Sequence, residues 1–329
     1  MQLHILSAED VRQALPMAQA ISSMKGAYGQ LSAGEATVPL RTQVAVPRYG
    51  GVSIFMPAYL TGSDDLAVKI VSVFPENAEQ NLPTIHGLVL ALDAETGRPL
   101  ALLEGGTLTA IRTGAGSGAA TDLLARPDAS IVAIIGSGVQ ARTQLEAVCT
   151  VRDVREVRVY SLHTEHARTF AREMAGQGPI PDVIEVVDSA ARAVQNADII
   201  CTATTAARPV FSGELLSAGA HINAVGSFRT DMQEVDVTTI RRSLVVVDSR
   251  DAVMAEAGDI VVPLEAGEID ETHIHAELGQ IINGERPGRS SAEQVTYFKS
   301  VGVAVQDAVA ASLALTNAQR QGLGTVVEL

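Results

Sequence analysis

Three basic residues lie within or beside apolar, small-residue segments: Arg41 in VPLRTQV, Lys69 in VKIVSVF and Arg112 in AIRTG. A buried charge without a partner is costly, so each needs an anion nearby. A structural carboxylate would satisfy any one of them. Three such cations in the N-terminal part of an acidic chain instead favour a cluster that binds a substrate carboxylate, since charge-assisted hydrogen bonds to carboxylates are strong.

A glycine-rich segment, Gly136-Ser137-Gly138-Val139-Gln140-Ala141, follows the apolar run IVAII and fits the pattern GxGxxA. Such glycines permit a tight turn that brings backbone N–H groups and a helix N-terminus to a pyrophosphate. Because a predicted strand precedes it and a predicted helix follows it, the match indicates a dinucleotide site. A second match, at 114–119, follows a helix-like segment, so we interpret its small residues as helix packing.

The end of the next predicted strand, VREVRVY, bears on the choice of dinucleotide. Related folds often place an acid there, which binds the ribose 2′-hydroxyl of NAD. Here the strand is followed by Ser161, and the first acid is Glu165. A neutral hydroxyl tolerates a 2′-phosphate, so NADP(H) is favoured as cofactor, with NAD(H) as the alternative.

The predicted secondary structure that must position these residues differs between the first and second parts of the chain. The first part predicts a strand at 3–6, a helix from its N-cap Ser7 to about Ser32, strands between residues 38 and 74, and a hairpin turning at 93–99. A helix is predicted over 107–125. From residue 131, short apolar strands alternate with helix-length segments, which is typical of a parallel, doubly wound sheet.

We therefore predict an α/β protein with a Rossmann-type doubly wound parallel sheet and an N-terminal α+β domain for substrate binding and dimerisation. The first domain comprises residues 1–120, and the predicted helix within 304–329 returns to it. The dinucleotide-binding domain comprises residues 121–303. A length of 329 residues suits two domains.

The composition limits the binding partners and the cellular location that we expect for this protein. A net charge of −14 disfavours nucleic acid and anionic membranes as partners. The two cysteines, Cys149 and Cys201, offer neither a metal spacing nor a disulfide framework. The pair His273 and His275 lacks a third clustered ligand, so no metal site is predicted. The start of the chain lacks the pattern of a signal peptide, and we expect a cytoplasmic protein.

Several segments together resemble the ornithine cyclodeaminase/mu-crystallin family, in order and over nearly the whole chain. They are VPLRTQV, VKIVSVFPEN, LTAIRTGAGSGAAT, IIGSGVQA, NAVGSF, EAGDI, ELGQIINGERPGR and YFKSVGVAVQDAVAA. The family includes ornithine and lysine cyclodeaminases, an archaeal-type alanine dehydrogenase and reductases of cyclic ketimines. The resemblance implies a homodimer formed through the N-terminal domain and an active site between the domains.

The resemblance also implies roles for particular residues. Lys69, Arg41 and Arg112 match catalytic or substrate-contacting cations, and Met56, Phe228 and Val301 match the substrate pocket. Residues that match the cofactor site are Thr84, Arg112, Gly136, Gly138, Val139, Gln140, Thr202, Val225, Gly226, Ser227 and Ser300, to which the strand-end argument adds Ser161.

One departure from the family pattern favours a particular chemistry. Phe228 stands where the cyclodeaminases keep a carboxylate, which can deprotonate the terminal amine of ornithine. A phenyl ring cannot do this, although Asp231 lies nearby and His86 is a further candidate for proton transfer. We therefore predict reduction of a cyclic ketimine carboxylate, Δ1-pyrroline-2-carboxylate or Δ1-piperideine-2-carboxylate, to L-proline or L-pipecolate. The alternatives are an alanine dehydrogenase-like oxidoreductase acting on an amino acid, an ornithine cyclodeaminase and a non-enzymatic crystallin-like binding protein.

Overall fold

A computed structural model describes residues 1–329, which form two compact units. Unit 1 comprises Met1–Arg112 and Val303–Leu329, and unit 2 comprises Thr113–Gly302. The first boundary lies inside a single helix, α3 (Gly105–Leu124). None of the helices combines the length and the hydropathy that crossing a bilayer would need.

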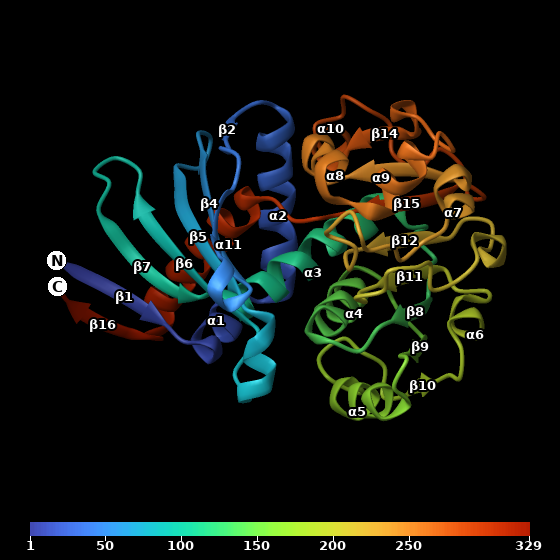
Figure 1. Ribbon diagram of the computed structural model, residues 1–329, viewed down its shortest axis with the longest axis horizontal. Coiled ribbons are helices and arrows are strands. Elements are labelled where there is room, and N and C mark those ends of the chain that lie inside the picture. Colours follow the sequence, from blue (N-terminus) through green and yellow to red (C-terminus); the bar gives the residue numbers. More distant parts are fainter. The chain divides into compact units, whose positions relative to one another are not determined.

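Unit 1 contains one eight-stranded sheet with helices packed on it (Figure 1). The strand order is β16-β1-β7-β6-β5-β4-β2, with β3 paired to β4; β1 and β7 are parallel and the other neighbours are antiparallel. The strands are β1 (Gln2–Leu6), β2 (Ala36–Thr37), β3 (Thr42–Val46), β4 (Gly51–Leu60), β5 (Asp65–Val73), β6 (Ile85–Asp93), β7 (Pro99–Glu104) and β16 (Thr325–Glu328). The helices are α1 (Ala8–Ala14), α2 (Met17–Ser32) and α11 (Ala304–Gln321), with 3-10 turns η1 (Pro47–Tyr49) and η2 (Pro75–Gln80).

The predicted single helix up to Ser32 is wrong, because the chain forms α1 and α2 with a break between them. The predicted N-cap is confirmed, since Ser7 and Asp10 form a capping box. The break comes at Leu15 and Pro16, where Pro16 is the N-cap of α2. Proline lacks an N–H and disfavours helical geometry in the residue before it, so a helix cannot run through this point unbroken.

The strand predicted from Val38 onward begins later than expected. Val38–Arg41 has no regular structure, and β3 starts only at Thr42. Pro39 in this stretch cannot donate to a strand ladder, which explains the late start. Arg41 therefore lies on the irregular segment that leads into β3.

The two faces of the unit 1 sheet differ in what covers them. Residues paired directly across strands share a face. On the face that α11 packs against, the row running from Met56 through Lys69 to Val89 is buried. The neighbouring row, from Phe55 through Ile70 to Leu88, lies on the opposite face and is half-buried or exposed. Unit 1 thus presents an apolar sheet face to its surroundings.

Unit 2 is built on an eight-stranded sheet in which every neighbouring pair is parallel, so the predicted Rossmann-type doubly wound fold is confirmed. The strand order is β10-β9-β8-β11-β12-β15-β13-β14. The strands are β8 (Ile131–Ile135), β9 (Glu156–Tyr160), β10 (Ile184–Val186), β11 (Ile199–Thr202), β12 (His221–Ala224), β13 (Ser243–Val247), β14 (Ile274–Glu277) and β15 (Val295–Lys299). The helices are α4 (Val139–Val151), α5 (Thr164–Met174), α6 (Ala190–Val194), α7 (Val237–Arg242), α8 (Arg250–Glu256), α9 (Gly258–Glu265) and α10 (Leu278–Ile282), with η3 (Gly213–Leu215) and η4 (Glu271–His273).

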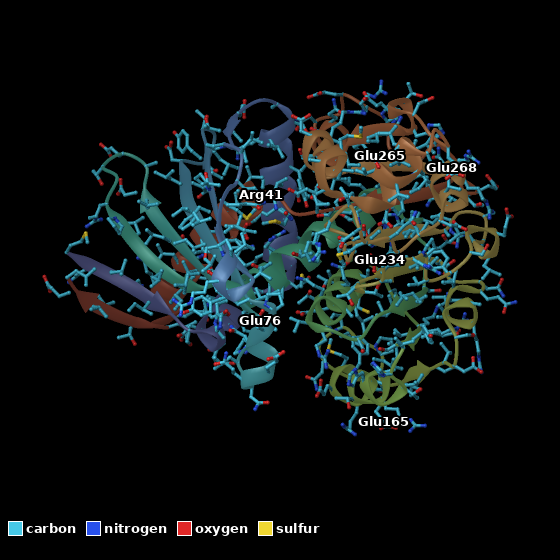
Figure 2. The ribbon with its side chains drawn as sticks, in the orientation of Figure 1. Arg41, Glu76, Glu165, Glu234, Glu265 and Glu268 are labelled. Atoms are coloured by element: carbon cyan, nitrogen blue, oxygen red, sulfur yellow. The ribbon has the colours of Figure 1, made fainter.

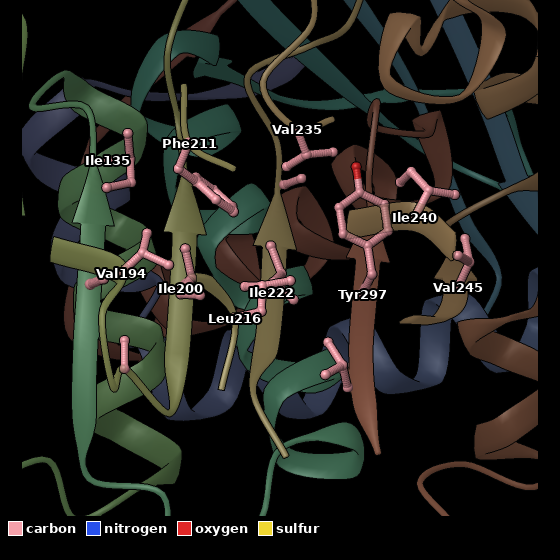
Figure 3. Packing of buried hydrophobic residues seen from close by; sticks show 14 of the residues in the cluster. Ile135, Val194, Ile200, Phe211, Leu216, Ile222, Val235, Ile240, Val245 and Tyr297 are labelled. Atoms are coloured by element: carbon pink, nitrogen blue, oxygen red, sulfur yellow. The ribbon is translucent and has the colours of Figure 1, made fainter. Parts of the chain in front are cut away.

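Both faces of the unit 2 sheet are buried. Ile135 and Ile200 belong to one core cluster, shown in Figure 3, while their neighbours Ile134 and Ile199 belong to a second cluster. Successive side chains of a strand point to opposite faces, so this division requires apolar cover on both sides. Continuous apolar strands such as IVAII follow from that cover.

The glycines at 114–119 lie inside α3, as the sequence predicted. A Cβ added at Gly114 would come within 2.4 Å of the backbone oxygen of Thr143 on α4. The glycine therefore permits close helix contact within unit 2, and the segment is not a phosphate loop.

Candidate active site

In unit 1, two of the three predicted cations meet at one carboxylate. Lys69 on β5 donates to Oδ1 of Asp307 on α11 at 3.2 Å, and the Nε of Arg112 donates to the same oxygen at 3.1 Å. Lys69, Arg112 and Asp307 are 5%, 5% and 1% exposed. We call these three residues the cation cluster. It carries two positive charges and one negative charge, so it keeps a net positive charge in a buried place.

The electrostatics of the cation cluster suit proton transfer. Burial lowers the pKa of Lys69 to about 8, although the charge of Asp307 opposes the shift. The charges of Arg112 and Arg41 lower it further, which means that Arg41 also lies within electrostatic range of the Lys69 ammonium. An ammonium with a pKa near neutrality can donate a proton at physiological pH and still exist in both forms.

Gln306 holds the guanidinium of Arg112 from a second direction. Its Oε1 accepts from Nη1 of Arg112 at 2.8 Å, and its Nε2 donates to the hydroxyl of Tyr28 on α2 at 2.8 Å. Arg112 is therefore fixed through Nε and Nη1 by two successive residues of α11. Its Nη2 makes neither of these contacts, which leaves a planar donor for another acceptor.

The remaining predicted residues of unit 1 vary in burial. Met56 is Lys69's cross-strand partner and is 8% exposed, so it lines the same covered face. Arg41, labelled in Figure 2, is half-buried. Thr84 is half-buried just before β6, and its carbonyl accepts from the N–H of Phe74. His86 lies on the uncovered face of β6 and is exposed, away from the row that holds Lys69.

In unit 2, the parallel strands bring their carboxyl ends to one edge of the sheet, which we call the carboxyl edge. The order of the strands reverses between β8 and β11. Ligands of open α/β sheets bind at such a switch point, beyond the carboxyl ends of the strands. The glycine-rich segment follows β8 at this place, and Thr202 ends β11 beside it.

The glycine-rich segment has the geometry that a pyrophosphate needs. Gly136 has φ +110°, and a Cβ there would come within 2.4 Å of the carbonyl oxygen of Ala203. Gly138 is the N-cap of α4, has open space around it and leaves the first turn without a side-chain cap. Val139 is 65% exposed in that turn, and the buried Oε1 of Gln140 has no partner. Free backbone donors at a helix start fit a dinucleotide's phosphates.

The end of β9 carries the hydroxyl that the sequence pointed to. Ser161 is half-buried, and its Oγ accepts a hydrogen bond from Ser137 of the glycine-rich segment at 2.9 Å. Glu165, the first acid beyond it, lies at the surface (Figure 2). It pairs with Arg168. A hydroxyl, rather than a carboxylate, therefore stands closest to the glycine-rich segment.

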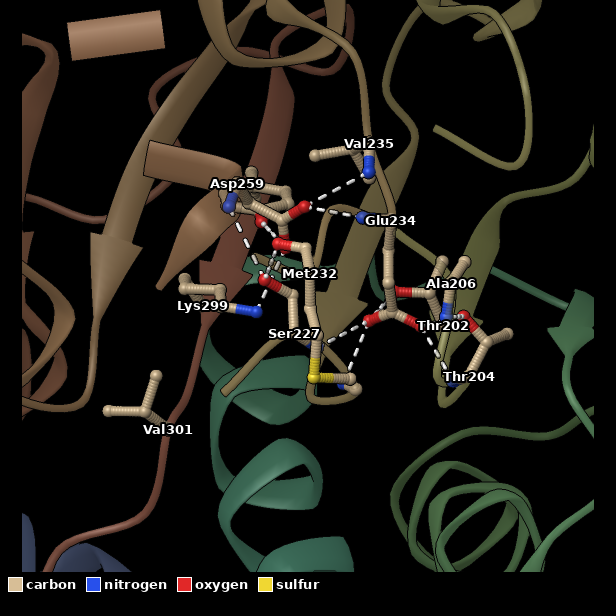
Figure 4. A network of polar contacts seen from close by, with 12 residues as sticks. Thr202, Thr204, Ala206, Ser227, Met232, Glu234, Val235, Asp259, Lys299 and Val301 are labelled. Atoms are coloured by element: carbon tan, nitrogen blue, oxygen red, sulfur yellow. Dashed lines mark hydrogen bonds and ion pairs between the residues drawn. The ribbon is translucent and has the colours of Figure 1, made fainter. Parts of the chain in front are cut away.

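A buried carboxylate organises the loops that follow β11 and β12 (Figure 4). Glu234 accepts from the Oγ of Thr202 at 2.9 Å, from the N–H of Gly226 at 2.7 Å and from the N–H of Ser227 at 3.3 Å. It also accepts from the N–H and hydroxyl of Thr204. Burial raises the pKa of Glu234, while the charge of Lys299 and the Thr204 donors lower it. Predicted cofactor residues from two strands are thus tied to one side chain.

A second carboxylate, Asp248 after β13, fixes the return of the chain after β15. It accepts from the hydroxyl of Ser300 at 2.7 Å and from the N–H groups of Val301 and Gly302 at 3.0 and 2.8 Å. Ser300 is buried, and Val301 is half-buried. Val225, the first residue after β12, is 8% exposed.

A model of the ornithine cyclodeaminase/mu-crystallin family matches residues 1–322. The chain is 42% identical to a Δ1-pyrroline-2-carboxylate reductase of Bacillus cereus over 325 residues, which cover 98% of this chain and 99% of that protein. The chain belongs to the ornithine cyclodeaminase/mu-crystallin family. This confirms the resemblance drawn from the sequence.

Two solved structures of family members are similar over the whole chain. Δ1-pyrroline-2-carboxylate reductase of Thermococcus litoralis, in complex with NADH and L-proline, has a TM-score of 0.92 and 46% identity, covering 98% of this chain and 99% of that one. An archaeal alanine dehydrogenase dimer with bound NAD has a TM-score of 0.91 and 32% identity, covering 100% of both chains.

The departure from the cyclodeaminases of the family is visible in unit 2. Phe228 follows the loop held by Glu234 and is 48% exposed. Asp231, the possible substitute for the missing carboxylate, is exposed and binds Arg229 through both carboxylate oxygens. Its pKa is lowered, chiefly by the hydrogen bond from Arg229. Asp231 is therefore a stable anion engaged in a surface ion pair.

Some residues that shape these family sites escaped the sequence analysis. Asp307 could have been found, since a carboxylate in the apolar stretch VAVQDAVAA poses the same burial problem as the three cations. Asp259, which lies in the segment EAGDI, is fully buried. Glu234 has no sequence signal, because TDMQEVD looks like any polar turn.

Proposed function

We propose that the chain reduces a cyclic ketimine carboxylate, Δ1-pyrroline-2-carboxylate or Δ1-piperideine-2-carboxylate, to L-proline or L-pipecolate with NAD(P)H. The observation that carries the proposal is the cation cluster, in which two buried cations share a single carboxylate oxygen. The surplus positive charge suits the carboxylate of the substrate. The 42% identity to a Δ1-pyrroline-2-carboxylate reductase supports the same reaction.

The proposed chemistry divides between the two units. Unit 2 holds the dinucleotide at its carboxyl edge, and the reduced nicotinamide, when bound, supplies the hydride that adds to the C=N carbon. In unit 1, Arg112 and Arg41 bind the substrate carboxylate. Lys69 gives one proton from Nζ to the ring nitrogen and regains it from water. One hydride and one proton convert the C=N bond into CH–NH, so atoms and charge balance.

An alanine dehydrogenase-like activity is the second candidate, because the chain is 32% identical to an archaeal alanine dehydrogenase over its full length. That reaction would use the same cations, but the enzyme would also have to capture free ammonia. Ornithine cyclodeamination is disfavoured by Phe228 and by the engagement of Asp231 with Arg229. A binding-only protein would have no need of both an intact cation cluster and an intact glycine-rich segment.

A substrate panel tests the proposal. Pyrroline-2-carboxylate, piperideine-2-carboxylate, pyruvate with ammonia, and ornithine are each mixed with the protein and either dinucleotide, and nicotinamide absorbance and ammonia are followed. We expect the two cyclic imines to give the highest kcat/KM. Ammonia release from ornithine at a rate equal to or above ketimine reduction would overturn the proposal, and preference for pyruvate with ammonia would favour the second candidate.

For the cofactor, we propose that NADP(H) is preferred over NAD(H). The support is the neutral Ser161 at the end of β9, where an acid would repel a 2′-phosphate. Glu165, the first acid beyond Ser161, forms a surface ion pair with Arg168. The similar structures carry NADH or NAD, so nicotinamide dinucleotides in general suit the family.

We also propose a homodimer that forms through the apolar sheet face of unit 1. Phe55, Ile70 and Leu88 lie side by side on that face, and Leu88 is 44% exposed. Large exposed apolar patches mark protein interfaces. The similar archaeal alanine dehydrogenase is a dimer, which supports the proposal.

A cytoplasmic location is proposed on the state of the cysteines. Cys149 and Cys201 are free and buried, and burial raises the pKa of each thiol to about 12. Thiols of this kind are kept as packing groups rather than as disulfides, as in proteins of reducing compartments. Localisation of a fluorescent fusion in the native cell checks this point.

A further inference from the structure

The carboxylate of Asp307 contacts two cationic side chains at once. It is the fourth residue of α11, and its Oδ1 receives both Lys69 from β5 and Arg112 from α3. Its Oδ2 is buried and has no hydrogen-bond partner. A surplus acceptor is unusual for a buried carboxylate, because its lone pairs are normally satisfied. Stability alone therefore does not account for a carboxylate here.

The contacts leave each cation with donors to spare. The Lys69 ammonium has three N–H groups, and one is directed to Asp307. Arg112 uses Nε for Asp307 and Nη1 for Gln306. Asp307 therefore holds both cations through one oxygen without using up their donors.

The charged groups that act on Lys69 come from three segments of unit 1. Asp307 on α11 supplies the negative charge, while Arg112 on α3 and Arg41 before β3 supply positive charges. Tyr28 on α2 reaches the cluster through Gln306. Removing the one negative charge would leave three cations facing one another, and like charges disfavour the protonated form of an amine.

We infer that Asp307 is a positioning residue of the proposed reduction, which holds Lys69 protonated and directed at the substrate while leaving its remaining donors free. The inference rests on the proposed function for the identity of the proton acceptor. The contact between Asp307 and Lys69 itself does not depend on that function.

The electrostatic consequence has a definite sign. Asp307 raises the pKa of Lys69 against the larger effect of burial, and the result is about 8. Without Asp307, the pKa of Lys69 falls below that value. A shift of one unit changes the protonated fraction about ten-fold on the alkaline side of the titration. Ketimine reduction consumes a proton, so the alkaline limb of its pH profile follows this pKa.

The decisive variant is Asp307→Asn, which keeps the shape and Oδ1 but removes the charge. We expect the alkaline limb of kcat against pH to move to lower pH by about one unit. Asp64→Asn is the matched control: it makes the same substitution at an exposed turn of unit 1, where Asp64 accepts only from Tyr59, and it should leave the profile in place. If kcat falls in Asp307→Asn but the alkaline limb of the pH profile does not move, Asp307 has only a structural role.

A second measurement needs no activity. A buried lysine with a lowered pKa makes the free energy of unfolding rise with pH between its folded and unfolded pKa values, because the unfolded chain then binds more protons. In Asp307→Asn this rise should begin at lower pH than in the wild type, as measured by denaturant unfolding. If the wild type reduces no imine, the proposed function fails, yet this curve still tests the link between Asp307 and Lys69. An unchanged onset overturns the inference.

Discussion

The ammonium of Lys299 lies 2.9 Å from Oδ2 of Asp259, and neither side chain has any exposed surface. The other oxygen of Asp259 accepts the N–H groups of Glu234 and Val235 at 2.6 and 3.1 Å. Glu234 in turn holds the N–H of Gly226 after β12. One buried ion pair thus fixes the backbone of Glu234, whose carboxylate holds two predicted cofactor residues, Gly226 and Ser227 (Figure 4).

The first prediction concerns Glu234→Gln. Its new NH2 group would face donors that now point at a carboxylate, and a buried donor left without an acceptor costs about 1–3 kcal/mol. We expect the free energy of unfolding to fall by about that amount and the dinucleotide Kd to rise roughly ten-fold. Denaturant unfolding and nicotinamide fluorescence measure the two effects. Glu165→Gln, at an exposed site of unit 2, is the control; equal effects from both variants would contradict the assignment.

Unit 2 contains both features that could be predicted from the sequence and features that could not. The glycine-rich segment could be predicted, because strand, tight turn and helix are local and leave a recognisable pattern. The position of β15 between β12 and β13 could not, since strand order depends on packing between distant segments. The pairing of Lys299 with Asp259 follows from that order and was equally hidden.

The same contrast holds in unit 1. Lys69 and Arg112 were found because charges in apolar surroundings are conspicuous in a sequence. Their shared partner was not assigned, because 238 residues separate Lys69 from Asp307. The break between the first two helices at Pro16 is by contrast a local effect that the proline itself signals in the sequence.

Lys69→Ala should lower kcat/KM for the cyclic imine by about 10²–10³, because it removes a proton donor and a charge near the substrate carboxylate. In the wild type, kcat should fall as pH rises above the Lys69 pKa of about 8, since the protonated form is the donor. Steady-state kinetics across pH test both statements. A wild-type rate that climbs steadily through that range is incompatible with Lys69 as the acid.

Arg41→Ala should act differently from Lys69→Ala. If Arg41 binds the carboxylate alike in the ground and transition states, its loss raises KM and leaves kcat nearly unchanged. It should also raise the pKa of Lys69, because Arg41 lowers that pKa. The alkaline limb would then move to higher pH, opposite to Asp307→Asn. A fall in kcat without a change in KM would assign Arg41 to the chemical step instead.

Ser161→Asp should reverse the cofactor preference. The wild type is expected to show a lower KM for NADPH than for NADH, because Ser161 is neutral beside the glycine-rich segment. An aspartate there would repel the 2′-phosphate and accept from the 2′-hydroxyl of NADH. The ratio of kcat/KM for the two dinucleotides is the measurement. Strong preference of the wild type for NADH would refute this account of the strand end.

The last prediction tests the proposed dimer through the apolar face of unit 1. Leu88 lies in the central part of this face, between Ile70 on β5 and Glu104 on β7, and it is 44% exposed, so Leu88→Glu places a charge there without disturbing a packed core. Burying an unpaired charge between two protomers is costly, so this variant should be a monomer at micromolar concentration while the wild type is a dimer. Val183→Glu, at a 76% exposed site of unit 2, should leave the mass unchanged. Light scattering gives the masses. A monomeric wild type would contradict the proposed dimer. A Leu88→Glu variant that stays dimeric would place the interface on another surface.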